Sequence, residues 1–143
     1  MSNVELRRIW PPDVYKLGHP SWEVPACAQV VEVTRTGPGR SIHVAGTYAW
    51  DVDCQLVEPS DMAGQVRAAL ENIRRSLAAV GATPADVVRV KSYVTSMEAF
   101  QREGTDEFRK FWGRQLPVST LVEIVRLGDP RALIEIEVYA EID

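Results

Sequence analysis

The sequence predicts an α+β fold in which one mixed β-sheet carries two helices on a single face. The clearest strand, residues 133–142, alternates apolar and polar side chains, which is typical of a strand with one buried face. The clearest helix, residues 60–80, has apolar side chains at three- and four-residue steps. Along the chain, the expected elements follow the order strand, strand, helix, strand, helix, strand, strand. Two helices cover only one face of such a sheet, and an uncovered face in a small domain usually marks a subunit interface.

The N-terminal part combines a short strand with a proline-rich loop. Residues 4–10 are expected to form the strand, which ends because the prolines that follow cannot donate to a sheet ladder. We interpret residues 11–25 as an ordered loop, since Tyr15, Leu17 and Trp22 are side chains that favour burial.

A β-hairpin is expected next. Residues 28–34 and 41–47 read as strands, and a glycine-rich turn joins them. Gly46 lies at the end of the second strand, and glycine at a strand end often lets another group approach the backbone closely. Tyr48 and Trp50 follow in a loop, where they could stack on a ligand or seal the core.

The middle of the chain predicts a helix, a strand and a second helix. Ser60 is the expected N-cap of the first helix, residues 60–80. Residues 87–95 alternate and form the strand. Residues 97–112 are expected to be helical, with Gly104 weakening their middle.

The C-terminal stretch is predicted to hold two strands, residues 118–125 and 133–142, joined by a tight turn. One face of the last strand carries three acids, and such a face cannot pack against a helix without great cost. It must therefore meet water, a partner subunit or a ligand. Its side chains are Glu135, Glu137, Tyr139 and Glu141.

The composition is that of an ordinary globular protein. The 143 residues are 45% hydrophobic and 25% charged, which suits one domain with its own core. The net charge of −4 and the lack of a basic cluster argue against nucleic-acid binding. No signal peptide or membrane-spanning run is visible. Because two cysteines are too few for a disulfide framework, we expect a reduced, cytoplasmic chain.

No pattern predicts a metal or an organic cofactor. His19 and His43 lack the spacing of a metal site. Cys27 and Cys54 have no flanking histidine or cationic cluster that would activate a thiol. No serine or cysteine nucleophile is visibly paired with a base. We therefore expect a chain without cofactors.

Several stretches resemble the RidA (YjgF/YER057c/UK114) family, and the likeness covers the chain from about residue 26 to residue 142. The order of the elements is part of it. The residues that carry it are the strands at 29–33 and 42–46, Gln65, Ala69, Leu70 and Asn72 on the long helix, and Pro117, Val122, Arg126, Leu127 and residues 134–136 near the C-terminus.

This resemblance implies a chorismate-mutase-like fold and a homotrimer whose three sheets form a central β-barrel. Ligand clefts would then lie between neighbouring subunits. Known members hydrolyse enamines and imines such as 2-aminoacrylate to 2-oxo acids and ammonia, without a metal or an organic cofactor. In them an arginine holds the substrate carboxylate by a bidentate contact, and a glutamate near the start of the last strand helps to position the attacking water.

The sequence departs from the family at the arginine. The position that we assign to it is Val118, which cannot hold a carboxylate. Thr120 stands in place of a cysteine common in the family, and Cys27 in place of a tyrosine. Arg114 and Arg126 are candidates for another cation, although a solvated role for the first and a structural role for the second are favoured.

Gly46 and Glu135 match the family. Glu135 would orient or deprotonate a water that attacks a C=N carbon; the alternative is a solvated or barrel-lining carboxylate. Ser119, Thr120 and the backbone near Gly46 would bind polar atoms of a small-molecule ligand, beside an apolar wall at Val118, although threonine is also simply a good strand residue. Two functions stay open: a hydrolase that acts on an imine, enamine or related molecule but poorly on 2-aminoacrylate, and a non-catalytic trimer that binds a metabolite or regulates a partner.

Overall fold

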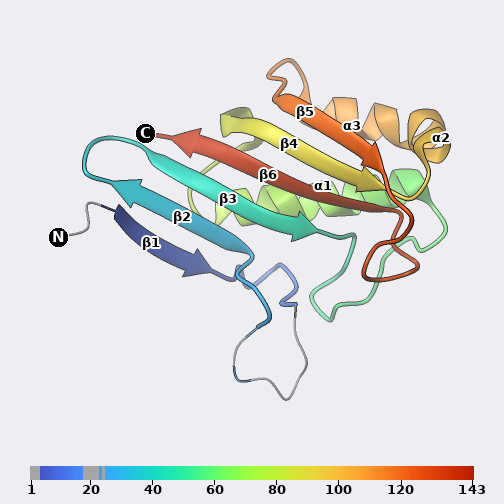
Figure 1. Ribbon diagram of the computed structural model, residues 1–143, viewed down its shortest axis with the longest axis horizontal. Coiled ribbons are helices and arrows are strands. Elements are labelled where there is room, and N and C mark those ends of the chain that lie inside the picture. The colour runs from blue at the N-terminus through green and yellow to red at the C-terminus, as the bar shows by residue number, and fades with distance from the viewer. Residues whose placement is uncertain (1–3, 18–22, 24) are drawn as a thin grey trace.

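The computed structural model describes all residues except 1–3, 18–22 and 24, and it confirms an α+β fold with one mixed sheet (Figure 1). Its strands are β1 (Val4–Ile9), β2 (Val30–Arg35), β3 (Arg40–Thr47), β4 (Val87–Val94), β5 (Val118–Glu123) and β6 (Ile134–Ile142). Its helices are α1 (Met62–Ala78), α2 (Met97–Ala99) and α3 (Thr105–Trp112), with a 3₁₀ turn at Pro84–Asp86 and a π-helical turn at Phe100–Gly104.

The strands lie in the order β1-β2-β3-β6-β4-β5, and β4 and β5 are the only neighbours among these described strands that run parallel. The prediction that the last two strands form a tight hairpin is wrong, because β4 lies between them. A parallel pair needs a crossover, and the segment that contains α2 and α3 provides it.

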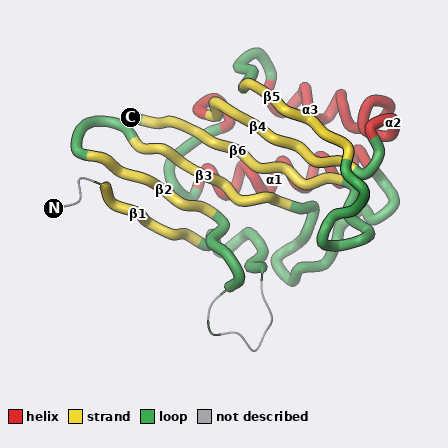
Figure 2. Tube along the Cα trace, viewed as in Figure 1, coloured by secondary structure: helices red, strands yellow, loops and turns green. Residues whose placement is uncertain are grey.

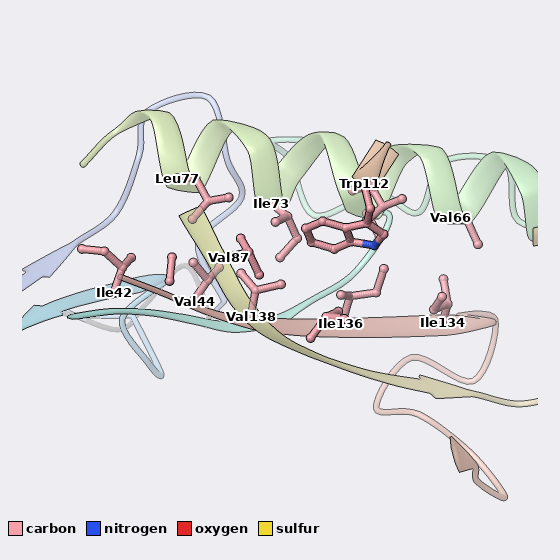
Figure 3. Close-up of a cluster of buried hydrophobic side chains, with 14 of the residues drawn as sticks. Ile42, Val44, Val66, Ile73, Leu77, Val87, Trp112, Ile134, Ile136 and Val138 are labelled. Atoms are coloured by element: carbon pink, nitrogen blue, oxygen red, sulfur yellow. The ribbon is translucent and has the colours of Figure 1, made fainter. Parts of the chain in front are cut away.

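The described helices lie on one side of the sheet (Figure 2). Apolar side chains of α1 point toward the central strands, and Trp112 of α3 fills the space beside them (Figure 3). Each fully buried aliphatic side chain stabilises the fold by roughly 1.5–3 kcal/mol. The strand residues of this layer include Ile42, Val44, Ile134, Ile136 and Val138, and the α1 residues include Val66, Ile73 and Leu77.

Two helix details differ from the sequence-based expectation. The N-cap of α1 is Asp61 and not Ser60, and its side chain makes no capping hydrogen bond. Gly104 ends a π-helical turn and packs closely, since a Cβ atom there would lie 2.8 Å from the Phe100 ring. This glycine therefore permits contact between neighbouring turns.

The opposite face of the sheet has none of the described helices on it, and its polar side chains contact one another. Lys91 on β4 forms an ion pair of 3.5 Å with Glu137 on β6. His43 meets the Tyr139 ring edge to face at 5.0 Å. None of the described helices is both long and apolar enough to cross a membrane.

The described residues of the loop before β2 contact the body of the protein at Tyr15. Tyr15 is buried as expected, but Leu17 is 39% exposed, so the prediction of its burial is wrong. Leu17 lies at the rim of a cleft described below. Trp22 and His19 lie outside the described residues.

Candidate functional site

Glu135 and Gly46 lie in direct contact where β3 leaves the sheet. The pairing of β3 with β6 shifts register between Val44 and Thr47, which places Gly46 against the Glu135 side chain. A Cβ atom at residue 46 would lie 2.0 Å from Oε1 of Glu135 and 2.8 Å from its Cδ. Only glycine leaves room for this carboxylate, as the sequence predicted for a strand-end glycine.

The surroundings of Glu135 make its carboxylate easier to protonate. Burial, followed by the nearby charge of Glu137, raises the pKa of Glu135, and a hydrogen bond with Tyr48 opposes this shift. A carboxylate with a raised pKa, held in a partly enclosed place, has the properties of a general base.

Two further side chains of the N-terminal segment belong to the same cluster. Burial strongly raises the pKa of Tyr15, and the charge of Glu135 adds to the effect. Burial also raises the pKa of the Cys27 thiol, again with a contribution from Glu135. Both groups are therefore neutral at pH 7, and Cys27 is not an activated nucleophile.

Tyr48 also lines a cleft of about 580 Å³. At its edge Arg131 donates to Asp129 over 2.9 Å, and the Trp50 indole donates to the same carboxylate over 3.3 Å. The Arg131 hydrogen bonds lower the pKa of Asp129. The Arg131 guanidinium is therefore already paired with Asp129. The cleft is lined by Leu17, Tyr48, Trp50, Gly128, Asp129, Pro130 and Arg131.

The residues predicted on β5 lie apart from Glu135 within one chain. Val118 pairs with Arg89 and Thr120 pairs with Lys91. Lys91 contacts Glu137, so Val118 and Thr120 lie on the open face of the sheet. Ser119 pairs with the buried Val90 and therefore lies on the helix side. Glu135 is level with Tyr93 and hence with Val122. Val118 lies two strands away from Glu135, which is about 10 Å across the sheet. It also lies four residues away along the strand direction, which is about 13 Å.

The structure thus brings together Gly46 and Glu135 but not Val118, Ser119 and Thr120. Arg114 and Arg126 are both exposed, and neither contributes to the pKa shift of Glu135. The sequence predicted Tyr48 as an aromatic that stacks on a ligand or seals the core, not as a partner of Glu135, and did not assign Tyr15 to the site. The sequence feature that could have pointed to these two tyrosines is the presence of aromatic side chains in segments without regular periodicity.

Comparisons with known proteins identify relatives of this chain. The family model described as endoribonuclease L-PSP matches residues 23–142. A RutC family protein of Pyrococcus horikoshii is 31% identical over 102 residues, which cover 71% of this chain and 79% of that protein. A RutC family protein of Pyrococcus abyssi is 30% identical over the same shares of the two chains.

The fold is also similar to solved structures. Rv2704 from Mycobacterium tuberculosis, described as a member of the YjgF/YER057c/UK114 family, is 36% identical with a TM-score of 0.66, covering 80% of this chain and 86% of that one. A putative endoribonuclease from Thermotoga maritima is 25% identical with a TM-score of 0.77, covering 96% and 98%.

Proposed function

Because the chain belongs to the endoribonuclease L-PSP family, the YjgF/RidA family, we propose that it is a cofactor-free hydrolase of a small imine or enamine, with Glu135 holding the attacking water. The observation that carries the proposal is the half-buried Glu135 carboxylate, packed on Gly46 and with a raised pKa. Such a group accepts a proton from water more readily than an exposed carboxylate does.

The chemistry needs only water and this carboxylate. Glu135 takes a proton from the water as the oxygen bonds to the C=N carbon, the electron pair of the double bond moves to nitrogen, and nitrogen takes that proton from Glu135. The hydroxyl proton of the resulting amino alcohol then passes by way of Glu135 to nitrogen as the C–N bond breaks, giving a carbonyl compound and ammonia. An enamine enters the same sequence after its carbon is protonated.

The substrate that we propose carries no carboxylate next to the reacting carbon. Residues 117–121 contain no arginine, and the groups that shift the pKa of Glu135 are Tyr48 and Glu137, neither of them cationic. A second carboxylate beside Glu135 would be repelled. Turnover of 2-iminopropanoate should therefore be poor.

The proposal includes a homotrimer in which the open sheet faces meet and small-molecule clefts lie between subunits. Val118 and Glu135 are far apart in one chain, so only a neighbouring subunit could bring a β5 edge to a given Glu135. The apolar side chains exposed along and beside β5, Leu116, Val118 and Val125, favour such a contact.

The word endoribonuclease in the name of the matching family does not fit the charges of this chain. Its net charge is −4, and the open face carries three glutamates of β6. RNA phosphates would be repelled there. We therefore propose a small-molecule substrate and not a nucleic acid.

The second candidate is a trimer that binds a metabolite without turnover. It is favoured by one observation: burial keeps the Tyr15, Cys27 and Tyr48 side chains neutral, so Glu135 has no strong acid beside it among the described residues.

Ammonia release from imines generated in situ, with and without a carboxylate, tests the proposal. A hydrolase should release ammonia faster from the uncharged imine than the solution reaction does, and Glu135→Gln should abolish the difference. If Glu135→Gln changes only the affinity measured by calorimetry and no turnover is found with either imine, the binding trimer is the correct function. Turnover of 2-iminopropanoate that equals turnover of the uncharged imine would contradict the assigned substrate class.

A further inference from the structure

We propose that Tyr48 is a positioning residue for Glu135, whose hydroxyl holds the carboxylate in place over Gly46. This inference deepens the proposed function, and it rests on the role given there to Glu135. It concerns a residue that follows β3 and lies between the Glu135 cluster and the cleft lined by Trp50.

Tyr48 is fixed at four points, so its hydroxyl has a defined place. Its backbone N–H donates to the Tyr15 hydroxyl over 2.8 Å, and its carbonyl accepts from Asn72 Nδ2 over 3.0 Å. Its ring stacks on Trp50 with the centroids 4.8 Å apart. The hydroxyl oxygen accepts from the backbone N–H of Gly128 over 3.3 Å. A side chain held in this way can position its neighbour without reorganising.

The hydrogen bond from Gly128 also sets the direction of the tyrosine proton. A phenol has one proton to donate, and here its oxygen already accepts from Gly128. Thr47 pairs with Ile136 in the β3–β6 ladder, so Tyr48 follows opposite Glu135, and its proton is free to point at that carboxylate. A carboxylate that accepts the tyrosine proton on one oxygen keeps the other for a water molecule.

The other groups around Glu135 do not replace Tyr48. Tyr15 and Cys27 face it from the N-terminal segment, Tyr93 is its neighbour on β4, and Glu137 follows on its own strand. Lys91, the nearest base by register, is paired with Glu137. Within the described part of the chain, none of the groups facing Glu135 is a cation. The tyrosine hydroxyl is therefore the donor that stabilises the negative charge of Glu135.

The decisive experiment compares two tyrosine-to-phenylalanine variants. Tyr48→Phe removes the hydroxyl and keeps the ring stack. Tyr139→Phe is the matched control, since Tyr139 donates to Glu137 over 3.3 Å on the same strand. The Glu135 carboxyl signal is identified in ¹³C-glutamate-labelled protein by its loss in Glu135→Gln, and its titration is followed in each variant.

We expect Tyr48→Phe to move the Glu135 titration to higher pH and Tyr139→Phe to leave it unchanged, because only the first loses a donor to the charged form. The acid limb of the kcat/KM profile should move in the same direction, with kcat/KM at pH 7 lower by roughly tenfold, as expected for one charge-assisted hydrogen bond. A residue that served only to pack the loop would lower the melting temperature without moving this titration.

A measurement without a variant at position 48 covers the case in which Tyr48→Phe does not fold. The chain has four tyrosines, and fluorotyrosine labelling gives each a ¹⁹F signal. The Tyr48 signal should titrate together with Glu135 and lose that transition in Glu135→Gln. A Glu135 titration that is unchanged in folded Tyr48→Phe, or a ¹⁹F spectrum with no such coupled transition, overturns the positioning role. Full turnover in Glu135→Gln would instead overturn the proposed function, while the titrations still decide the role of Tyr48.

Discussion

Oε1 of Glu135 lies 2.0 Å from the place that a Cβ atom would occupy at Gly46. No real side chain tolerates such a distance, so the two residues form one unit: the glycine exists to make room for the acid. The atom in conflict is the end of a flexible side chain and not backbone. A larger residue at position 46 would therefore displace the carboxylate before it disrupted the sheet.

Gly46→Ala should lower the free energy of unfolding by about 1 kcal/mol, the low end of the usual cost of overpacking, because the displaced carboxylate is the end of a flexible side chain. In a Glu135→Ala background the same substitution should cost almost nothing, because the clashing group is gone. Chemical denaturation of the four proteins of this double-mutant cycle measures the coupling. Equal costs in both backgrounds would mean that Gly46 is needed for its backbone and not for the carboxylate.

Asn72 should be among the most costly polar residues to replace. It is buried on α1, and its amide donates to the carbonyls of Tyr48 and Trp50 over 3.0 and 2.8 Å. Asn72→Ala leaves both carbonyls without this donor, at roughly 1–3 kcal/mol each. We expect a loss of about 3 kcal/mol in the free energy of unfolding.

Glu71→Ala is the control for this prediction. Glu71 is adjacent on the helix and forms ion pairs with Arg74 and Arg75 at the surface. Such pairs are worth about 1 kcal/mol or less. If the two variants lose similar stability, the loop that holds Tyr48 does not depend on Asn72.

The strands and the long helix could be predicted because side-chain periodicity reports which face of an element is buried. Periodicity does not report which strands are neighbours. Residues 118–125 and 133–142 look like a hairpin in sequence, yet β4 inserts between them. The parallel pairing of β4 with β5 depends on packing of the crossover helices, and no local pattern encodes it.

The candidate site was predictable only where it lies on regular structure. Strand alternation places Glu135 on the acidic face, and its role at a site is what the family resemblance implies; Gly46 was predicted from its place at a strand end and from the same resemblance. Tyr15 comes from a loop with no periodicity, and it reaches the site by a contact across 33 residues of sequence. Val118 and Thr120 were expected in an intersubunit cleft with Glu135, and the register of β5 separates them from Glu135 within one chain.

A trimer predicts that a charge on the open face near β5 will separate the subunits. Val118 is 65% exposed and on the open face by its pairing with Arg89. Wild-type protein should show three times the chain mass of 16.0 kDa in light scattering, and Val118→Glu should shift it toward a single chain. Val52→Glu is the control, since Val52 is 54% exposed but lies in the loop between β3 and α1, outside the sheet. Wild-type protein that runs as a monomer would contradict the trimer.

The raised pKa of Glu135 predicts a stability that depends on pH in a specific direction. In the unfolded chain this carboxyl has its ordinary pKa of 4.5, whereas burial raises the pKa in the folded protein. The folded state therefore holds its proton more tightly. The stability from this difference is fully present below pH 4.5 and is lost as the pH rises through the folded-state pKa. At pH 7 the ionised carboxylate opposes folding.

Glu135→Gln removes that opposition, so the variant should be more stable than wild type at pH 7, and the gain should shrink steadily as the pH falls below the folded-state pKa. Denaturation midpoints measured between pH 4 and pH 8 test this. Glu137→Gln should show no gain at pH 7, because Lys91 lies 3.5 Å from that carboxylate and already offsets its charge. A Glu135→Gln protein whose stability differs from wild type by the same amount at every pH would show that the folded protein does not disfavour the ionised Glu135 carboxylate. The raised pKa would then give no support to a functional role for this residue.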